Sequence, residues 1–411
     1  MKKYAFAGAS GRAFMMYAKP ILGYYKDYAT IVGMYDINGL RARSIAAELS
    51  PEIPVFDDFD EMLRVAKPDV VIVTTVDAFH HEYIIRSLEA GCEVVTEKPM
   101  TIDADKCEAI LQAEKKYGKK VTVTFNYRYI PYNTEIKRII ASGQLGDIYS
   151  VDFEWTLDRN MDYGAHGTSY FRRWNRYMAK SGGLLVHKST HHFDMVNWWL
   201  GQDPEQVFAY GKLNVYGKNG PFRGKNCRTC PHAKECEFYV DITKDEYLSK
   251  HYIANEHVDG YLKDSCVFTE DIDIYDTMSV NVRYNKGTIL NYSLIAHAAY
   301  EGWRISINGS KGRLEAEYPE TGLPAKSDTF QLRFYDLEGR VHTTEMPKGS
   351  GGHGGGDNRL LDSIFIGNQA DPLGHQAGTR DGAYSILIGA SANVSIRENR
   401  PVDIKEKVTL L

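Results

Sequence analysis

The stretch Cys92-Glu93-Val94-Val95-Thr96-Glu97-Lys98-Pro99 joins a short apolar run to the tripeptide that ends it. The run predicts a buried parallel strand that stops at the tripeptide. Pro99 cannot continue a central strand, and its ring restricts Lys98 to extended conformations. Ligands of open α/β sheets bind in the crevice outside the carboxyl ends of the strands. Lys98 is therefore predicted to present its ammonium group to that crevice.

A glycine turn near the amino terminus predicts a dinucleotide site. The apolar strand 4–7 is followed by Gly8-Ala9-Ser10-Gly11-Arg12-Ala13 and then by the apolar-periodic stretch 14–22. Strand, glycine turn and helix in this order let backbone N–H groups and a helix N-terminus approach a pyrophosphate. The G-x-G-x-x-G fingerprint is imperfect, because Ser10 and Ala13 replace its second and third glycines. The predicted cofactor contacts in this turn are Gly8, Ser10, Gly11, Arg12 and Ala13.

The second strand of this pattern, 30–35, ends at Asp36. A carboxylate at this place accepts hydrogen bonds from the adenosine ribose hydroxyls and repels a 2′-phosphate. NAD is therefore the predicted cofactor. Arg41 and Arg43 lie nearby in the sequence, so NADP remains the less favoured alternative.

Alternating strands and helices continue to residue 125. The strand at 69–75 is almost continuously apolar, as parallel strands buried on both faces are. The other predicted elements are helices at 41–49, 59–66, 80–90 and 103–117 and strands at 92–96 and 120–125. This alternation predicts a doubly wound parallel sheet, an NAD-binding Rossmann domain formed by residues 1–125.

Composition restricts the possible partners. The 411 residues have a net charge of −5 with both signs interspersed, so nucleic acid is not an expected partner. No window approaches ~20 uninterrupted apolar residues, and the apolar run near Met1 stops at Gly8, so neither a membrane span nor a signal peptide is predicted. We expect a cytoplasmic protein of two domains. Its 28 tyrosines offer flat apolar faces with a polar tip, as sugar-binding sites do.

A cluster of polar groups within apolar flanks marks the second domain. It is Ser181-Gly182-Gly183-Leu184-Leu185-Val186-His187-Lys188-Ser189-Thr190-His191-His192-Phe193-Asp194, and it follows Phe171-Arg172-Arg173-Trp174. His187, His191 and Asp194 are spaced four and three residues apart, so one helical face can carry all three. A metal site at these residues is one interpretation.

The amino-terminal motifs resemble those of the glucose-fructose oxidoreductase, inositol dehydrogenase and MocA (Gfo/Idh/MocA) family. They are the turn at 8–13, Asp36, the segment Thr75-Val76-Asp77-Ala78-Phe79-His80 and Glu97-Lys98-Pro99. The resemblance implies that Thr75, His80 and Glu97 help to hold the cofactor. It also implies that Lys98 lies beside the nicotinamide and the substrate hydroxyl.

The resemblance continues through Asn126-Tyr127-Arg128-Tyr129-Ile130-Pro131 and the polar cluster at 181–194. By the family's G-G-G-x-L-x-D-x-G-x-H-x-x-D run, His191 is the acid/base histidine that faces Lys98. His187 departs from the family's aspartate, and Asp77 departs from the usual T-P-N-x-x-H pattern. For Arg128, a structural ion pair is the alternative to a role at the ligand. The predicted substrate contacts are Tyr127, Arg128, Arg172, Arg173, Trp174, Asp194 and His353.

The chemistry of hydride removal supports these assignments independently. Oxidation of an alcohol carbon also removes the hydroxyl proton, which imidazole can accept near neutral pH. An ammonium group beside the developing alkoxide stabilises it electrostatically. Lys98 and His191 with a nicotinamide form a chemically complete set, and His187 is predicted to assist.

Four cysteines fall in an insertion at about 220–270. Cys227, Cys230, Cys236 and Cys266 give the spacing C-x2-C-x5-C-x29-C, which predicts a structural zinc site, with an iron-sulfur cluster as an alternative. Four unbound thiols and replacement of one thiol by His232 are further alternatives.

The rest of the second domain, 126–411, predicts an α/β domain with a large, mostly antiparallel sheet. Strands are predicted at 146–155, 278–284, 288–296, 303–308 and 313–317, and helices at 132–142, 359–366 and 381–397. A second subunit packed sheet to sheet would cover the outer face, so a homodimer or homotetramer is expected. The glycine-rich segment 349–356 is either a flexible linker or a loop that brings His353 to the site.

Together these features predict an NAD-dependent oxidoreductase that acts on a secondary hydroxyl of a sugar, glycoside or cyclitol. One alternative keeps the cofactor but cleaves a glycoside without net redox change, through a transient keto-sugar. In that reaction His187 would serve as the extra base. The other alternative is a non-enzymatic sensor of NAD or sugar, which the loss of fingerprint glycines would permit.

Overall fold

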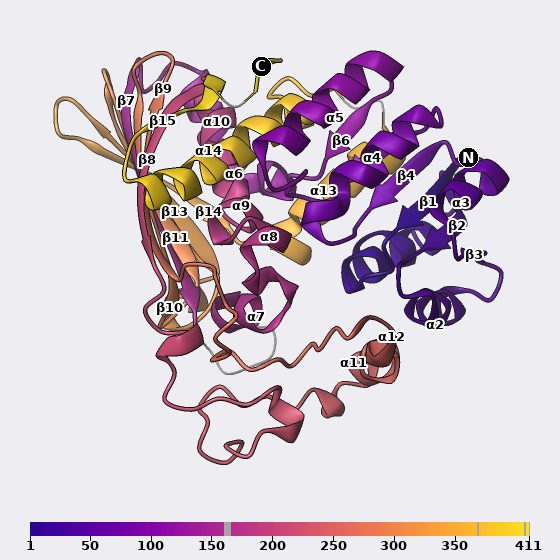
Figure 1. The fold of residues 1–411 in the computed structure, drawn as a ribbon. Coiled ribbons are helices and arrows are strands. Elements are labelled where there is room, and N and C mark those ends of the chain that lie inside the picture. Colours follow the sequence, from indigo (N-terminus) through magenta and orange to yellow (C-terminus); the bar gives the residue numbers. More distant parts are fainter. Residues whose placement is uncertain (160–165, 368–369, 407, 411) are drawn as a thin grey trace.

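Two sheets, one in each half of the chain, organise the fold (Figure 1). The structure is a computed structural model that describes residues 1–159, 166–367, 370–406 and 408–410. The first sheet is parallel throughout, with the strand order β3-β2-β1-β4-β5-β6. This arrangement confirms the predicted doubly wound Rossmann sheet.

The elements of the first sheet follow the predicted order. Its strands are β1 (Lys2–Ala7), β2 (Ala29–Tyr35), β3 (Val55–Phe56), β4 (Val70–Val73), β5 (Glu93–Thr96) and β6 (Val121–Val123). Its helices are α1 (Lys19–Leu22), which continues a π-helical turn at Ala13–Ala18, α2 (Gly39–Leu49), α3 (Phe59–Ala66), α4 (His80–Glu89) and α5 (Ala104–Tyr117). All four residues of β4 are buried, as its unbroken apolar sequence requires.

One helix from the far end of the chain completes the first domain. Helix α13 (Gly356–Phe365) packs its apolar face into the core formed by β1 and the first helical segment. The ring of Phe365 lies 5.1 Å from that of Tyr4, and the Tyr25 hydroxyl donates to Asp362 at 2.8 Å. The core on this side of the first sheet therefore contains residues from two separated parts of the sequence.

The second sheet has nine strands in the order β14-β13-β12-β11-β7-β10-β9-β8-β15. Only β7 and β10 pair in parallel; the other pairs are antiparallel. The strands are β7 (Ile148–Asp158), β8 (Pro204–Lys212), β9 (Thr277–Tyr284), β10 (Ile289–Ala298), β11 (Gly302–Gly309), β12 (Gly312–Pro319), β13 (Thr329–Asp336), β14 (Val341–Pro347) and β15 (Val402–Asp403). The mostly antiparallel sheet is confirmed, and β8, β13, β14 and β15 extend it beyond the predicted strands.

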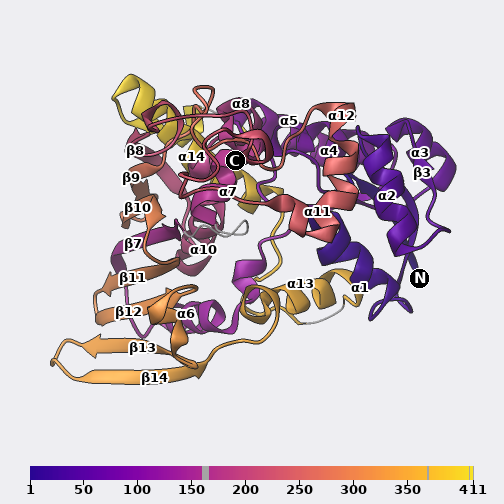
Figure 2. The same ribbon diagram turned by 90° about the horizontal axis from the view of Figure 1, so that it is seen from below.

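Helices cover one face of this sheet and leave the other open (Figures 1 and 2). The covering helices are α6 (Pro131–Ala141), α10 (Thr190–Leu200) and α14 (Thr379–Glu398), and the shorter helices nearby are α7 (His166–Arg172), α8 (Met178–Ser181) and α9 (Leu184–His187). Alternate residues of β9 are buried and exposed, as a half-covered strand requires.

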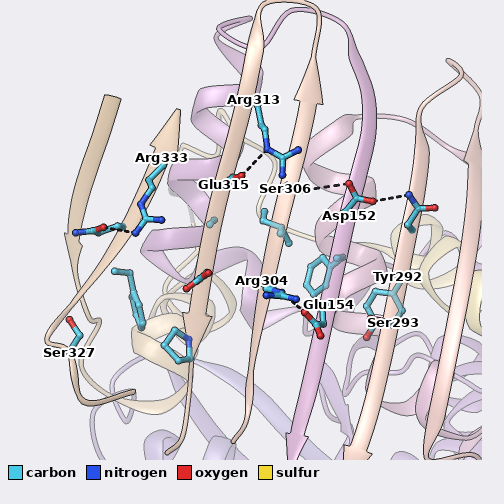
Figure 3. Close-up of a pocket in the computed structure, with 18 of the residues that line it drawn as sticks. Asp152, Glu154, Tyr292, Ser293, Arg304, Ser306, Arg313, Glu315, Ser327 and Arg333 are labelled. Carbon is cyan, nitrogen blue, oxygen red and sulfur yellow. Dashed lines mark hydrogen bonds and ion pairs between the residues drawn. The ribbon is translucent and has the colours of Figure 1, made fainter. Parts of the chain in front are cut away.

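The open face carries charged and polar side chains. Figure 3 shows them on β7, β10, β11, β12 and β13, where they line a shallow hollow. Arg304 forms an ion pair with Glu154, and Arg313 pairs with Glu315 at 2.8 Å. Both signs of charge are therefore present on this face.

The cysteine-containing insertion lies between β8 and β9 and reaches the first domain. It carries α11 (Glu246–His251) and α12 (Glu256–Asp259), which lie beside α2 in both views (Figures 1 and 2). No helix in the described part of the chain combines the length and apolar composition needed to cross a membrane.

Candidate active site

The turn after β5 holds Lys98 through its neighbours. The preceding residue, Glu97, is buried and accepts hydrogen bonds from Tyr17 Oη at 2.6 Å and Arg12 Nε at 2.7 Å. Burial alone would raise the pKa of Glu97, but Arg12, Lys98 and the Tyr17 bond hold it below its usual value. The Lys98–Pro99 peptide bond is cis. An ionised, fixed carboxylate thus lies beside the lysine.

The Lys98 ammonium group has no carboxylate within ion-pair distance among the described residues. Burial and then the neighbouring Lys188 cation lower its pKa to about 8, against the opposing effect of Glu97 and Asp77. A lysine with this pKa exchanges its proton within the physiological range. Lys98 is therefore able both to stabilise an oxyanion and to take part in proton transfer.

His191, on the first turn of α10, is buried and stacks on Tyr127 with ring centroids 4.0 Å apart and an interplanar angle of 12°. Its buried Nδ1 has no hydrogen-bond partner among the described residues. Burial, followed by the Lys98 and Lys188 cations, lowers the pKa of His191 well below the ordinary value. The imidazole is therefore neutral near pH 7 and is able to accept a proton.

His187 has different surroundings. Its Nδ1 lies 2.5 Å from Asp77 Oδ2, and its Nε2 lies 3.1 Å from the amide nitrogen of Asn175. Donation from Nδ1–H to Asp77 leaves Nε2 to accept from Asn175, so one neutral tautomer satisfies both contacts. The Trp174 ring stands edge-on to His187 at 5.6 Å. His187 is thus fixed by protein contacts, whereas His191 keeps a nitrogen without one.

Asp77 supplies the carboxylate that position 187 lacks. Burial raises the pKa of the Asp77 carboxyl well above its usual value, and the Lys98 cation opposes that effect. Arg173 also acts on it electrostatically, while its guanidinium donates to the Ser169 carbonyl and hydroxyl at 3.1 Å each. Asp77 and His187, the two residues that depart from the family pattern, are therefore hydrogen-bonded to each other across the two domains.

His80 connects two turns at the carboxyl edge of the parallel sheet. Its Nδ1 lies 2.9 Å from the Pro99 carbonyl oxygen, and its Nε2 lies 3.1 Å from that of Thr75. The side chain is buried. His80 thus fixes the position of the Thr75 turn relative to the Lys98 turn.

The glycine turn has the shape that a dinucleotide requires. Gly8 has φ of +101°, and a Cβ added to it would lie 2.8 Å from the Thr74 backbone. Ser10 Oγ accepts from the Ala13 N–H at 3.1 Å, which closes the turn where the helix begins. The place of the second fingerprint glycine is therefore filled by a side chain that caps the helix.

Asp36 lies at the end of β2, next to this turn. Its Oδ2 accepts from the Ala9 N–H at 2.7 Å, and its Oδ1 accepts from the Asn38 N–H at 2.8 Å. Arg41 Nη1 lies 3.8 Å from Asp36 and Nη2 lies 2.6 Å from Asp259 in α12. The adenosine end of the predicted cofactor site is thus bordered by the insertion.

Three titratable groups on the second-domain side of the site are not among the predicted site residues. Lys188 is buried, with its Nζ 5.3 Å from the centre of the Trp155 ring. Burial raises the pKa of Glu301 and that of Glu320 to about 7 each, and Lys188 opposes both shifts. The Glu301 carboxylate lies 2.5 Å from His166 Nδ1. Lys188 stands inside the quoted motif, but no local pattern marks the two glutamates.

His353 lies on the rim of this group. It pairs with Asp357 at 2.9 Å, and its ring centre is 5.7 Å from that of Tyr127. Although burial acts to raise it, the His353 hydrogen bond and charge hold the pKa of Asp357 at about 2. The glycine-rich segment therefore reaches the site, as one of its two interpretations predicted.

Two predicted substrate contacts form a buried ion pair. Arg128 Nη2 and Nε donate to the two carboxylate oxygens of Asp194 at 2.6 and 2.8 Å, and Arg128 also pairs with Asp381 at 3.0 Å. Both side chains are at most 2% exposed. This geometry agrees with the alternative interpretation of Arg128 as part of a structural ion pair. Both carboxylate oxygens of Asp194 accept hydrogen bonds from Arg128.

Arg172 is not at the site, contrary to the prediction. Its guanidinium is buried in the insertion, where Nη1 donates to Cys227 Sγ at 3.1 Å and Nη2 to the Phe238 carbonyl oxygen. Arg172 is the last residue of α7, whereas Arg173 follows the helix in an extended conformation, so the two side chains point to different surroundings.

The predicted metal site is not confirmed. Cys227, Cys230, Cys236 and Cys266 are free thiols that line one small cavity with Arg172. Within the described residues, no group of three or more His, Cys, Asp or Glu side chains is placed to hold a metal ion. The Arg172 guanidinium already brings a positive charge against these sulfur atoms, which disfavours a cation there.

Comparisons with known proteins agree with this fold. The model "Oxidoreductase family, NAD-binding Rossmann fold" matches residues 2–125, and "Oxidoreductase family, C-terminal alpha/beta domain" matches residues 137–404. The protein YteT of Bacillus subtilis (strain 168) is 42% identical over 99% of this chain and 98% of its own length.

More distant relatives have assigned reactions. An inositol 2-dehydrogenase of Serratia proteamaculans (strain 568) is 27% identical over 56% of this chain and 59% of its own. A levoglucosan dehydrogenase solved with NADH and levoglucosan shares the fold, with a TM-score of 0.67, 17% identity and coverage of 98% of this chain and 99% of its own. By both family models and the full-length similarity, the chain belongs to the Gfo/Idh/MocA family of oxidoreductases.

Proposed function

We propose that the protein is an NAD-dependent dehydrogenase that oxidises a secondary hydroxyl of a sugar, glycoside or cyclitol. The observation that carries the proposal is the pair of Lys98, with a pKa of about 8, and His191, a neutral imidazole with a buried nitrogen free of hydrogen bonds among the described residues. Relatives that act on inositol and levoglucosan support the substrate class.

The proposed roles follow from charge and hydrogen bonding. Lys98 donates to the substrate hydroxyl and stabilises the alkoxide that forms as the C–H bond breaks. His191 accepts the hydroxyl proton, and the imidazolium so formed is stacked on Tyr127. When bound, the nicotinamide supplies the acceptor for the hydride. Asp77 and His187 hold the opposite side of the substrate and fix each other's orientation.

NAD is the proposed cofactor because the adenosine end of the site carries carboxylates. Asp36 would meet a 2′-phosphate, and the guanidinium that could bind that phosphate, Arg41, is paired with Asp259 at 2.6 Å. Gly8, Gly11, Thr75 and the Asp36 turn would hold the dinucleotide.

The test is a substrate panel. Purified protein is mixed with NAD⁺ and inositols, aldoses, anhydrosugars or glycosides, and formation of NADH is followed by absorbance. The Lys98→Met and His191→Asn variants serve as matched controls that retain the cofactor turn. Turnover in the wild type that both variants lack supports the proposal, and equal rates in all three would reject the assigned roles.

Glu301 and Glu320 favour a second candidate function. With pKa values of about 7, both carboxyls are partly protonated near neutral pH and are able to donate a proton to a glycosidic leaving group. The second candidate is therefore glycoside cleavage without net redox change. It predicts release of an aglycone with bound NAD⁺ and no accumulation of NADH.

We also propose that the open face of the nine-stranded sheet forms a subunit interface. Its mixed ion pairs, such as Arg304 with Glu154, are complementary to a second copy of the same face. Light scattering of the purified protein measures the assembly, and Arg304→Glu is expected to weaken it.

A further inference from the structure

The insertion sends an arm, residues 241–263, from the second domain across to the dinucleotide turn (Figures 1 and 2). Polar contacts fix it along α2. His251 Nδ1 lies 2.8 Å from Ser44 Oγ, and its Nε2 lies 2.9 Å from Glu48, which also pairs with Lys250 at 2.5 Å. The Asn38 side-chain amide donates to the Asn255 carbonyl oxygen at 2.9 Å.

Two hydroxyls of this arm converge on the turn. The Gly11 N–H donates to Tyr252 Oη at 3.0 Å, although this N–H at the helix start is one that a pyrophosphate would accept from. The Tyr247 hydroxyl lies 3.5 Å from where a Cβ on Gly11 would stand. It is buried and meets hydrogen-bond geometry with no described residue. The arm thus places two neighbouring tyrosine hydroxyls, those of Tyr252 and Tyr247, at the same point.

Positive charge gathers beside these hydroxyls. Lys263 Nζ lies 4.3 Å from the centre of the Tyr252 ring, and neither Lys263 nor Arg173 has a carboxylate within ion-pair distance among the described residues. Burial, followed by the charges of Arg173 and Arg41, lowers the pKa of Lys263 to about 7. Like charges held together in this way favour an anion between them.

We propose that the arm is the outer wall of the dinucleotide site, in which Tyr247, Tyr252 and Lys263 bind the pyrophosphate opposite the turn at 8–13. The inference rests on the proposed use of a nicotinamide dinucleotide. When the cofactor binds, the Gly11 N–H donates its hydrogen bond to a phosphate oxygen instead of to Tyr252 Oη. The Tyr252 and Tyr247 hydroxyls in turn donate hydrogen bonds to the phosphates. The Lys263 ammonium pairs with the same anion.

Closure by the arm makes release of the cofactor slow. Release would break phosphate contacts and the tether of the arm to α2 together, so dissociation is expected to limit exchange more than association does. The protein is therefore expected to retain NAD(H) through purification.

The test is the rate of NADH dissociation from the full-length protein, followed by its fluorescence, together with the Kd for NAD⁺ from calorimetry. Tyr247→Phe and Tyr252→Phe are each expected to speed dissociation roughly tenfold, and Lys263→Met roughly 10-fold to 100-fold, because each removes a hydrogen bond to a charged group. Tyr239→Phe is the matched control, since it removes a hydroxyl from an exposed position of the same insertion. It is expected to leave both quantities unchanged.

Hydrogen exchange provides a readout without substitutions. NAD⁺ is expected to slow exchange of the amides at 246–259. If the wild type binds NAD⁺ and all three variants release NADH at the wild-type rate, the role of the arm is overturned and the proposed function still stands. Tighter binding by Tyr252→Phe would also overturn it, since that residue would then be a competitor. Absence of NAD⁺ and NADP⁺ binding to the wild type would reject the proposed function and this inference together.

Discussion

Exchanging the residues at positions 77 and 187 tests whether the site works through a relocated carboxylate. In this chain the carboxylate is Asp77 and its partner is His187, 2.5 Å away. The single variants are Asp77→Asn and His187→Asp, and the double variant restores the family's usual pattern of an amide at 77 and a carboxylate at 187. Asp77→Asn removes the carboxylate and leaves an amide oxygen as the weaker acceptor, and His187→Asp removes the imidazole donor, whereas the double change rebuilds the bond in the opposite direction.

The magnitude follows from the burial of this bond. Loss of a buried hydrogen-bond partner costs about 1–3 kcal/mol, and each 1.36 kcal/mol is tenfold in rate, so Asp77→Asn is expected to lower kcat/KM by about 5-fold to 150-fold. His187→Asp brings two carboxyls into contact, of which only one can ionise, and a comparable loss is expected. If the two substitutions acted independently, the relative kcat/KM of the double variant would be the product of the two single values. We expect it to be higher than that product by roughly tenfold or more.

The assay is kcat/KM for the sugar substrate at saturating NAD⁺, with thermal unfolding of each variant as the control for folding. If the coupling energy between the two substitutions is the same in unfolding as in kcat/KM, the bond contributes to stability alone. Independent effects of the two substitutions, within about 0.5 kcal/mol, would refute the reasoning.

Further changes probe the remaining contacts. Lys98→Met should abolish turnover while leaving the Kd for NAD⁺ within about threefold, measured by calorimetry. In the wild type, kcat/KM should fall as pH rises through about 8, because Lys98 loses the proton that stabilises the alkoxide; Lys98→Arg should move this limb upward. Asp259→Asn should free Arg41 and shift the NAD⁺/NADP⁺ preference toward NADP⁺ by about tenfold, measured by the two Kd values. Gly8→Ala should destabilise the fold by about 1–3 kcal/mol and lose NAD⁺ binding, measured by denaturant unfolding and calorimetry, because its Cβ meets the Thr74 backbone at 2.8 Å.

Local sequence patterns predicted most of the first domain. The apolar run at β4 and the glycine turn before the first helix depend on neighbouring residues, so their structure can be anticipated without the rest of the chain. The strands β13 and β14 were missed although β13 alternates in burial, because β14 is exposed along almost its whole length and has no apolar face to signal it.

The site was less predictable where it depends on distant parts of the chain. Asp77 and His187 are 110 residues apart, so each departure from the family pattern was visible but their pairing was not. Arg172 and Arg173 are adjacent and chemically equal, and the end of α7 between them separates their surroundings. The arm contacts on Gly11 join residues 241 positions apart, which no spacing rule anticipates.

The position of α13 has a consequence for how the protein is made. The core around Tyr4 and Tyr25 is completed only when Phe365 has left the ribosome, about 240 residues after the end of the first domain, which takes roughly 12–48 s at typical rates of synthesis. Until then the nascent first domain exposes the apolar surface that α13 later covers. A fragment consisting of residues 1–125 is therefore expected to bind chaperones and aggregate, whereas fusing 356–367 to its carboxyl terminus should restore its solubility.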